Sequence, residues 1–436
     1  MGWLGDRSGG APGEMFLFDI SKLYAKWMDD IRLAQGANGC VPDIAPPYWR
    51  MFTDNVTWPS CVTFIPHWLH RHYGDVRVGE RNFGAIARWI GHMESYLDGG
   101  LLSRDVYGDW CVPPESHPLI HSEREDRKTS PVLLASAYLA KNLELAAGLA
   151  QTLGRPERAD VWLARRREIA AALNARFFDP STGCYDNGSQ TACLLPLAFG
   201  LAPEEHRRKI FDQLAHRIGE SGRPSIGTGL VGGQRLMRTL TAWGRSDLAL
   251  REDYPGWGYM IRRGATTIWE LWNGDSADPL MNSGNHVMLG DLLTWLFEDV
   301  AGIQPASPGF ESIRFRPHIL FDEIDCSHHL IRGPIASRWM TANKKVLWEV
   351  SVPPNTTACA ELPASSARSL RVNGRTQEFH PISSPCSPFP WITTPLAPGA
   401  HSLAFDLPAE FRCSPPDRGL PTRKTGKKTE DILQAV

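Results

Sequence analysis

Apolar residues recur at helical spacing through the first 300 residues of this chain. In the stretch FLFDISKLYAKWMDDIRLA they occupy one face of a helix, from Phe16 to Ile31. A second helix is expected after Ser130, which can cap its first turn, with Pro131 at the first helical position. No alternation of strands and helices is visible, which disfavours a parallel α/β sheet. The pattern predicts short paired helices from about residue 15 to residue 300, joined by loops rich in Gly, Pro and Asp.

The helical stretch carries no strict sequence repeat, which disfavours a regular solenoid. A closed ring of helical hairpins fits this pattern better. In such a ring, the longer loops gather at one end and form a funnel.

The pattern of apolar and polar residues changes near residue 305. Short runs with alternating apolar and polar residues follow, such as ASRWMTANKKVLWEVSV, which predicts a hairpin over Asn343–Lys345. These runs predict an antiparallel β-sandwich of about 100 residues. From residue 414 the chain is polar, basic and rich in Pro, which is typical of a disordered tail. The expected domains are therefore 1–303, 304–413 and 414–436.

The charge and cysteine content exclude several classes of protein. The net charge is −2 and no long basic face is visible, which argues against a nucleic-acid partner. No run approaches the roughly 18 apolar residues that a membrane span needs, so no membrane partner is expected. The nine cysteines are scattered without a CxxC pair, which indicates free thiols and no metal site. Together with the absence of an apolar leader, these thiols predict a cytoplasmic location.

The chain is rich in tryptophan, with 16 residues. Many of these indoles lie in Gly-, Pro- or Asp-rich stretches, where helix packing does not need them. A sugar ring has an apolar C–H face that stacks on an indole, so this placement indicates a carbohydrate site. The tryptophans concerned are Trp3, Trp58, Trp110, Trp257, Trp269 and Trp272.

The segment GATTIWELWNGD, residues 264–275, holds the candidate catalytic group. Glu270 lies between Trp269 and Trp272, and indoles on both sides would shield its carboxylate from water. Such a carboxylate is a good general base. The alternative is a capped helix start with the tryptophans in the core and Glu270 exposed.

Other loops pair an aromatic side chain with a polar one ahead of an expected helix. Loops of this kind from one helical ring would converge on one funnel. Paired carboxylates with tryptophan platforms are what glycoside hydrolysis needs. The candidate residues in these loops are Trp3, Asp6, Trp58, Asp109, Trp110 and His286.

The sequence resembles the inverting α-L-rhamnosidases, from Trp3 to about residue 408. The resemblance is carried by GWLGD, TWPSCVTFIPHWLHRHYGD, YGDW, YPGWGYMIRRGATTIWELW, MNSGNHVMLGDLLTWLFEDVAGI and VPPNTTACAELP. The segments GATTIWE and MNSGNH are the most specific. The resemblance implies a mainly α fold, namely an (α/α)6 toroid of the six-hairpin type, followed by a small antiparallel β-sandwich. It also implies a rhamnoside substrate and no cofactor.

The resemblance assigns a role to each candidate residue. Glu270 corresponds to the general base that activates water. Asp6 and Asp109 correspond to acidic residues that bind the sugar hydroxyls or support the site, and His286 to a histidine that contacts the sugar. For Asp6 the alternative is a frayed N-terminal residue, and for His286 a capping or core histidine. The aromatic walls around the sugar ring and its methyl group correspond to Trp3, Trp58 and Trp110.

The resemblance also implies residues ahead of Met1. In the family, GWLGD ends a longer motif that carries the general acid, a Glu, seven residues before the position of Asp6. We therefore expect an N-terminally incomplete toroid with impaired turnover. Two other functions remain open: another (α/α)6 exo-glycosidase, such as an α-L-fucosidase, and an inactive carbohydrate-binding remnant.

Overall fold

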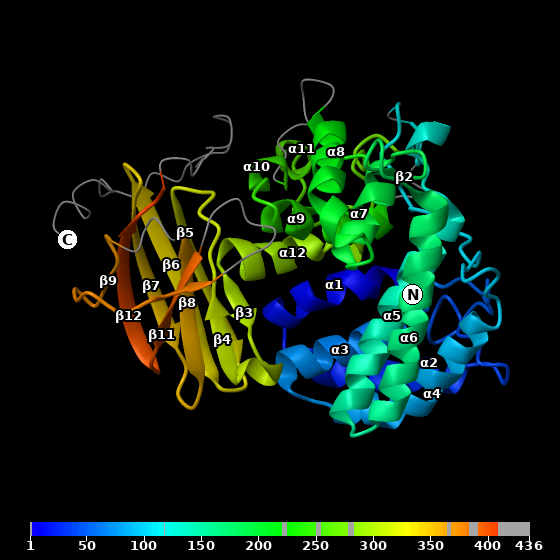
Figure 1. The fold of residues 1–436 in the computed structure, drawn as a ribbon, viewed down its shortest axis with the longest axis horizontal. Helices are drawn as coiled ribbons and strands as arrows, with labels where there is room; N and C mark the ends of the chain where they lie inside the picture. Colours follow the sequence, from blue (N-terminus) through cyan, green and yellow to red (C-terminus); the bar gives the residue numbers. More distant parts are fainter. Residues whose placement is uncertain are drawn as a thin grey trace.

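The computed structural model describes residues 2–116, 118–219, 225–249, 254–277, 283–363, 368–382 and 391–408. A helical part and a β part lie side by side (Figure 1). The predicted disordered tail, 414–436, lies outside the described residues.

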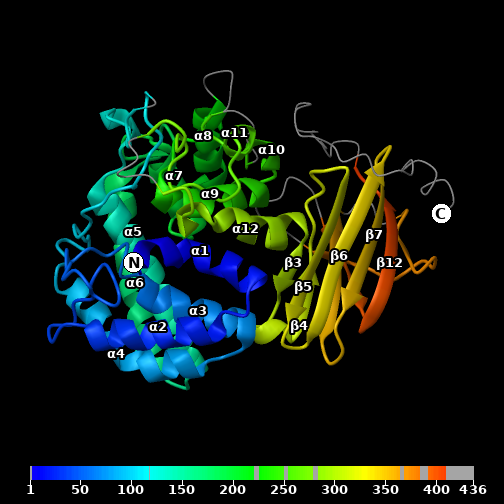
Figure 2. The ribbon, with the colours of Figure 1, turned by 180° about the vertical axis from the view of Figure 1, so that it is seen from behind.

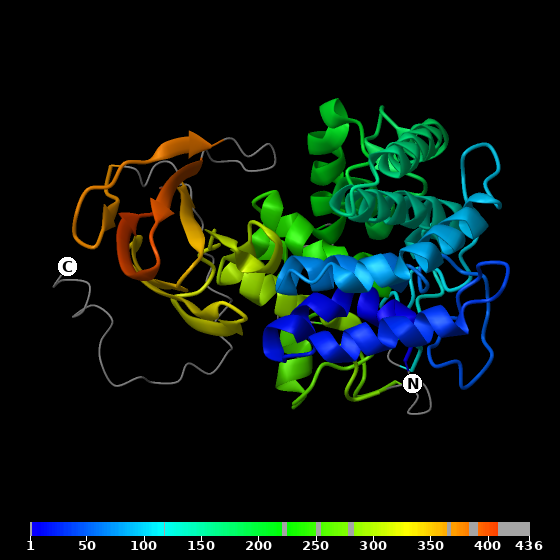
Figure 3. The same cartoon turned by 90° about the horizontal axis from the view of Figure 1, so that it is seen from below.

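The helical part is a ring of antiparallel helices, and Figures 2 and 3 show it from behind and from below. The longest hairpin joins α5 to α6, and each of these helices has Pro near its first turn, where the missing N–H costs nothing. The helices are α1 (Leu4–Leu17), α2 (Ser21–Ala34), α3 (Cys61–Tyr73), α4 (Arg77–Glu94), α5 (Pro131–Thr152), α6 (Pro156–Phe177), α7 (Gln190–Ala198), α8 (Arg207–Gly219), α9 (Leu230–Ala242), α10 (Ser246–Ala249), α11 (Trp257–Arg262) and α12 (Asp291–Trp295).

Helix α1 was not expected, because its sequence LGDRSGGAPGEMFL is rich in Gly and has Pro12 inside, both of which disfavour a helix. It is nevertheless buried along most of its length, between α3 and α12 (Figure 1). Its glycines allow the neighbours to come close. A Cβ at Gly5 would lie 2.5 Å from the ring of Trp58, and one at Gly10 would lie 2.8 Å from the carbonyl oxygen of Val287. Tertiary packing therefore forms this helix against its local preference.

Two predicted helices are interrupted in the structure. The apolar pattern from Phe16 to Ile31 is shared by α1 and α2, because Phe18 is extended and ends α1. The expected apolar helix after His286 consists of a 3₁₀ turn (Val287–Leu289), α12 and a π-helical turn (Leu296–Val300).

In its described residues, the β part has two five-stranded sheets, with strand orders β10-β11-β8-β4-β3 and β5-β6-β7-β12-β9. The predicted hairpin is confirmed: Ala342 pairs with Lys345, and Asn343 and Lys344 form a two-residue turn with φ of 51° and 64°. The strand pairs in these sheets are antiparallel except β4 with β8, which is parallel. The strands are β3 (Ile303–Pro305), β4 (Ser312–Phe315), β5 (Glu323–Leu330), β6 (Gly333–Ala342), β7 (Lys345–Val352), β8 (Thr357–Pro363), β9 (Arg371–Val372), β10 (His380–Ile382), β11 (Trp391–Leu396) and β12 (Gly399–Asp406), beside a small β1 (Phe178–Asp179) and β2 (Cys184–Tyr185) hairpin.

The β part is attached at the C-terminal end of α1. The ring of Phe16 lies 5.2 Å from that of His328 on β5, and the hydroxyl of Ser337 on β6 donates to the carbonyl of Ala301 at 2.7 Å. With a rise of about 1.5 Å per residue, the 14 residues of α1 span about 21 Å. The N-terminal end of α1 therefore lies far from the β part.

Within the described residues, the stretch Glu125–Thr152 is the one that is long and apolar enough to cross a membrane. It contains α5, and 72% of its apolar window is buried inside the protein. Packing within the helical ring therefore accounts for its apolar character.

Candidate active site at the N-terminal end of α1

Asp6 is held firmly in the first turn of α1. Its side chain accepts a hydrogen bond at Oδ1 from Nε2 of His286, over 2.7 Å, and the residue is only 9% exposed. The start of α1 is fixed as well, because the backbone N–H of Leu4 donates to the carbonyl of Asp43. Asp6 is therefore not a frayed terminal residue.

Glu270 and His286 are brought together by backbone hydrogen bonds between two loop segments. The backbone N–H of Glu270 donates to the carbonyl of Ser283 at 3.0 Å, and that of His286 to the carbonyl of Ile268 at 2.8 Å. The backbone N–H of Ser283 also donates to Oε2 of Glu270 at 2.9 Å, which fixes this carboxylate. Nδ1 of His286 then lies 3.6 Å from the same Oε2.

Asp6, His286 and Glu270 thus form one row, which we call the His286 cluster, with the imidazole between two carboxylates. Burial lowers the pKa of His286, but the hydrogen bond to Asp6 and the charges of Asp6 and Glu270 outweigh it, so that the net pKa is raised. The three side chains are between 12% and 21% exposed, so they are accessible to water. The row can therefore hold a proton on His286, between the side chains of Asp6 and Glu270.

Three of the predicted aromatic residues stand near the start of α1. Trp58 is buried against Gly5, and its ring lies 4.4 Å from that of Tyr107. Trp110 is half-buried and meets Tyr107 and His121 edge to face, at 5.9 Å and 4.5 Å. Trp3 precedes α1 and pairs through its backbone with Ile44. These indoles come from three separate segments, as expected for loops that converge.

Asp109 is used to hold another helix. Oδ2 accepts from the hydroxyl of Thr191 and from the N–H of Gly229 at 2.8 Å, and Oδ1 accepts from the N–H of Gly232 at 3.0 Å. The two glycine donors lie at the N-terminal end of α9, where a carboxylate is stabilised. Burial raises the pKa of Asp109 in spite of these bonds. This geometry favours the supporting role over direct binding of sugar hydroxyls, because both oxygens are engaged.

The indoles beside Glu270 are arranged differently from the sequence expectation. Trp272 is buried and packs edge to face on Trp257, with ring centroids 4.8 Å apart. Trp269 is half-buried. The two flanking indoles therefore do not enclose Glu270 symmetrically.

Sequence reasoning missed two residues beside this site. Cys111 is buried, and burial together with the charges of Glu270, Asp109 and Asp6 raises the pKa of its thiol. Asp105 accepts from the hydroxyl of Thr57 at 3.3 Å, and burial raises its pKa to about 6. The only signal for either was its position next to YGDW.

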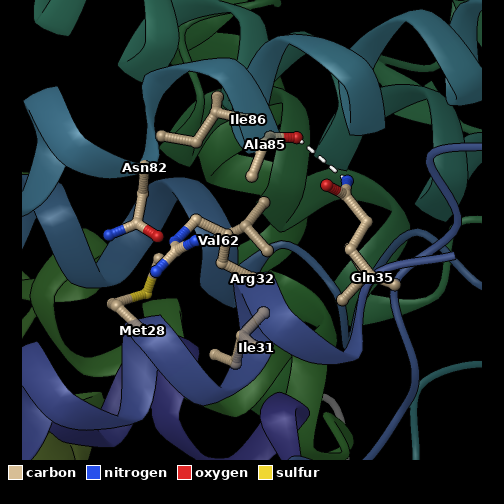
Figure 4. A pocket seen from close by; sticks show the side chains of 9 residues that line it. Met28, Ile31, Arg32, Gln35, Val62, Asn82, Ala85 and Ile86 are labelled. Atoms are coloured by element: carbon tan, nitrogen blue, oxygen red, sulfur yellow. Dashed lines mark hydrogen bonds between the residues drawn. The ribbon is translucent and has the colours of Figure 1, made fainter. Parts of the chain in front are cut away.

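Two other features lie away from the His286 cluster. Figure 4 shows a cavity of about 10 Å³ between α2 and α4, lined mainly by apolar side chains such as Met28 and Ile86. It has room for one water molecule at most. A grouping of potential metal ligands within the described ranges consists of Cys40, Asp54 and His92. This group of potential metal ligands shares no residue with the His286 cluster.

A ring of helical hairpins, with carboxylates and indoles gathered at one end and a β-sandwich at the other, defines the six-hairpin class of glycoside hydrolases. Residues 1–300 match the family of the bacterial alpha-L-rhamnosidase six-hairpin glycosidase domain, and residues 302–377 match the bacterial alpha-L-rhamnosidase C-terminal domain. The chain therefore belongs to the bacterial alpha-L-rhamnosidase family.

Individual relatives agree with this assignment. An alpha-L-rhamnosidase of Formosa agariphila is 32% identical over 384 residues, which cover 86% of this chain and 41% of the relative. The solved alpha-L-rhamnosidase of Dictyoglumus thermophilum is similar with a TM-score of 0.84 and 25% identity, over 93% of this chain and 46% of that one. The Streptomyces avermitilis alpha-L-rhamnosidase, solved with L-rhamnose, is similar with a TM-score of 0.82 and 27% identity. The match covers 92% of this chain and 38% of that one. The chain spans less than half the length of each of these relatives.

Proposed function

We propose that this chain acts on terminal α-L-rhamnosyl residues, and that Glu270 is the general base of an inverting hydrolysis. The observation that carries the proposal is the His286 cluster, in which a fixed carboxylate lies beside a histidine at the end of the ring where the indoles gather. Its relatives are named alpha-L-rhamnosidases, and L-rhamnose is bound in one of them. The proposed apolar walls around the 6-deoxy sugar are formed by Trp3, Trp58 and Trp110.

In this reaction a water molecule attacks the anomeric carbon while Glu270 takes one of its protons. The bond between that carbon and the leaving oxygen breaks on the opposite face, so the configuration inverts. The N–H of Ser283 holds Oε2 of Glu270, and we assign Oε1 to the water. His286, held by Asp6, has its Nδ1 3.6 Å from the same Oε2, so its charge acts on Glu270.

The leaving oxygen needs a proton of its own. The family resemblance places the donor seven residues ahead of Asp6, which is before Met1. Glu14 and Glu115 do not replace it: Glu14 is bound by Arg7 and Tyr24, and Glu115 by Ser122 and Arg127. General acid catalysis contributes about 10²–10⁴-fold, so the donor matters most for substrates with poor leaving groups.

The test uses an aryl α-L-rhamnoside, whose leaving group needs little protonation. Glu270→Gln should lower kcat about 100-fold or more, because the amide cannot take the proton from water. Glu323→Gln, at an exposed position on β5, is the matched control and should leave kcat unchanged. NMR of the first-formed sugar anomer checks inversion.

Each other outcome points to a different function. A Glu270→Gln variant with unchanged kcat would contradict the assigned base. Faster hydrolysis of an aryl α-L-fucoside than of the rhamnoside would favour the fucosidase alternative. Rhamnose binding by calorimetry, without hydrolysis of the aryl rhamnoside, would favour a binding remnant.

A further inference from the structure

Cys40, Asp54 and His92 gather at a place that the proposed function does not use. Their ligand atoms all lie within 4.8 Å of one another. Sγ of Cys40 is 3.3 Å from Oδ1 of Asp54, and Nε2 of His92 is 2.7 Å from the same oxygen. Cys40 and Asp54 lie between α2 and α3, and His92 lies on α4. Cys40 and the side chain of His92 are each less than 10% exposed.

We propose that these three residues bind a zinc ion, with water as the fourth ligand. Thiolate, imidazole and carboxylate are the groups that Zn²⁺ prefers, and three protein ligands with one open position are a common zinc arrangement. The irregular spacing of 40, 54 and 92 matches no zinc motif, which explains why the sequence predicted no metal site.

One distance between the ligand atoms already suits a tetrahedral ion, and a second must lengthen. Zinc bonds of about 2.3 Å to sulfur and about 2.0 Å to oxygen or nitrogen place sulfur and oxygen about 3.5 Å apart, and nitrogen and oxygen about 3.3 Å apart. The sulfur–oxygen distance of 3.3 Å already fits. The hydrogen bond between His92 and Asp54 must open by about 0.6 Å.

The loop that carries Cys40 is fixed before any ion binds. Gln35 donates through Nε2 to the carbonyls of Gly39 and Ala85, each at 3.0 Å, and Figure 4 shows its bond to Ala85 on α4. Gly39 has φ of +94°, and a Cβ there would lie 2.7 Å from the carbonyl oxygen of Arg88. Glycine thus lets this loop approach the helix that carries His92.

Neighbouring groups orient the other two ligands. The Tyr96 hydroxyl is hydrogen-bonded to Asp54, and its ring meets His92 edge to face at 5.1 Å. Partners of this kind fix the orientation of metal ligands. Asp54 adopts a left-handed backbone with φ of 61°, which is uncommon outside glycine and marks a constrained position.

Binding exchanges a proton for the metal without any redox change. The thiol proton of Cys40 leaves to solvent as the sulfur–zinc bond forms, and His92 binds as neutral imidazole.

The ion would tie both ends of the segment 40–54 to α4. This segment supports the start of α1, since Asp43 accepts from Leu4 and Ala45 donates to Gly2. The zinc site therefore acts on stability of the wall beside Trp3 and not on the chemistry at Glu270.

The experiment titrates the metal-stripped protein with Co²⁺, followed by absorption, and with Zn²⁺, followed by calorimetry. We expect one ion per chain and a thiolate-to-cobalt band in the near ultraviolet. Cys40→Ser should remove the band, and His92→Gln should weaken zinc binding at least about 10-fold, since even partners of ligands cost 10–100-fold. The control Cys326→Ser, at a half-buried position on β5, should bind as the wild type does.

Two results would overturn the proposal. One is a cobalt titration of the wild-type protein without a thiolate band. The other is a band that persists in Cys40→Ser, which would assign it to another thiol. If Cys40→Ser does not fold, as judged by circular dichroism, the wild-type spectrum and the His92→Gln affinity still decide.

Discussion

Two charged clusters lie at opposite ends of α1 and are built in opposite ways. At the N-terminal end, the His286 cluster places one imidazole between two carboxylates. At the C-terminal end, the ring of Phe16 stacks on Phe297 and meets His72 edge to face, next to a second cluster. This second cluster, the Arg71 cluster, consists of Arg71, Glu298, Arg238 and Asp291.

In the Arg71 cluster, Glu298 and Asp291 each lie against a cation, and a third acid, Asp299, lies near them with its pKa raised to about 8 by burial. Both guanidinium nitrogens of Arg71 donate to the two carboxylate oxygens of Glu298. Nη2 of Arg238 lies 2.7 Å from Oδ1 of Asp291, although the two are not aligned as a hydrogen bond. The carboxylates are buried, with side chains only 7% and 3% exposed.

The difference between the clusters separates structural charges from chemical ones. Each of these two buried acids faces a guanidinium that offsets its charge, although burial still raises the pKa of Asp291. The two acids of the His286 cluster share one titratable histidine, so their charge is not fully compensated. They are also more exposed, where water and a substrate can reach them. The first arrangement favours stability and the second favours proton transfer.

The largest stability effect is expected in the Arg71 cluster. Asp291→Asn removes a carboxylate that faces the buried Arg238, and such a loss costs about 3–5 kcal/mol of unfolding free energy. Urea unfolding followed by tryptophan fluorescence measures it. The control Asp212→Asn breaks an exposed pair with Arg208 and should cost less than about 1 kcal/mol. Equal losses in the two variants would remove the distinction between the clusters.

A smaller loss is expected from the helix that connects the clusters. Gly5→Ala would place a Cβ 2.5 Å from the ring of Trp58, and overpacking of this kind costs about 1–3 kcal/mol. In the control Gly91→Ala, on the exposed side of α4, no atom lies within 4 Å, so the variant should be stabilised by about 0.5–1 kcal/mol. Thermal unfolding of both variants checks the opposite signs. A Gly5→Ala protein as stable as the wild type would show that α1 can shift.

The sequence predicted the fold where local signals and packing agree. The helices of the ring and the turn at Asn343 and Lys344 could both be predicted, because side-chain spacing indicates the helices and turn residues indicate the turn. Helix α1 could not be predicted from its sequence. Its glycines disfavour a helix locally, and their use becomes visible only when Trp58 and Val287 are seen against them.

The sequence proposed the members of the candidate site but not the contacts between them. Asp6 and His286 are 280 residues apart, so nothing local indicates their hydrogen bond. The anchoring of Asp109 by Thr191 and the start of α9 was equally invisible. The resemblance named these residues, whereas the structure adds that Asp109 holds a helix and that His286 faces two carboxylates.

The smallest stability effect is expected within the His286 cluster. In Asp6→Asn the charge that favours protonated His286 is lost, so the pKa of His286 should fall. Because that pKa is raised in the folded wild type, the stabilisation it gives is complete below the ordinary value of 6.5 and is lost as the pH rises through the folded pKa. The stability difference between wild type and variant should therefore be present just below pH 6.5 and vanish in alkaline solution.

An NMR titration of the His286 ring, assigned through His286→Gln, measures the shift directly. The control is Asp212→Asn, on the separate helix α8. In this variant the imidazole of His286 should titrate as it does in the wild type. If Asp6→Asn left the pKa of His286 unchanged, the carboxylate at position 6 would not act on the histidine. The contact between Asp6 and His286 would then be one of packing without an electrostatic effect. The charged histidine beside Glu270 would no longer distinguish this end of α1 from the other end.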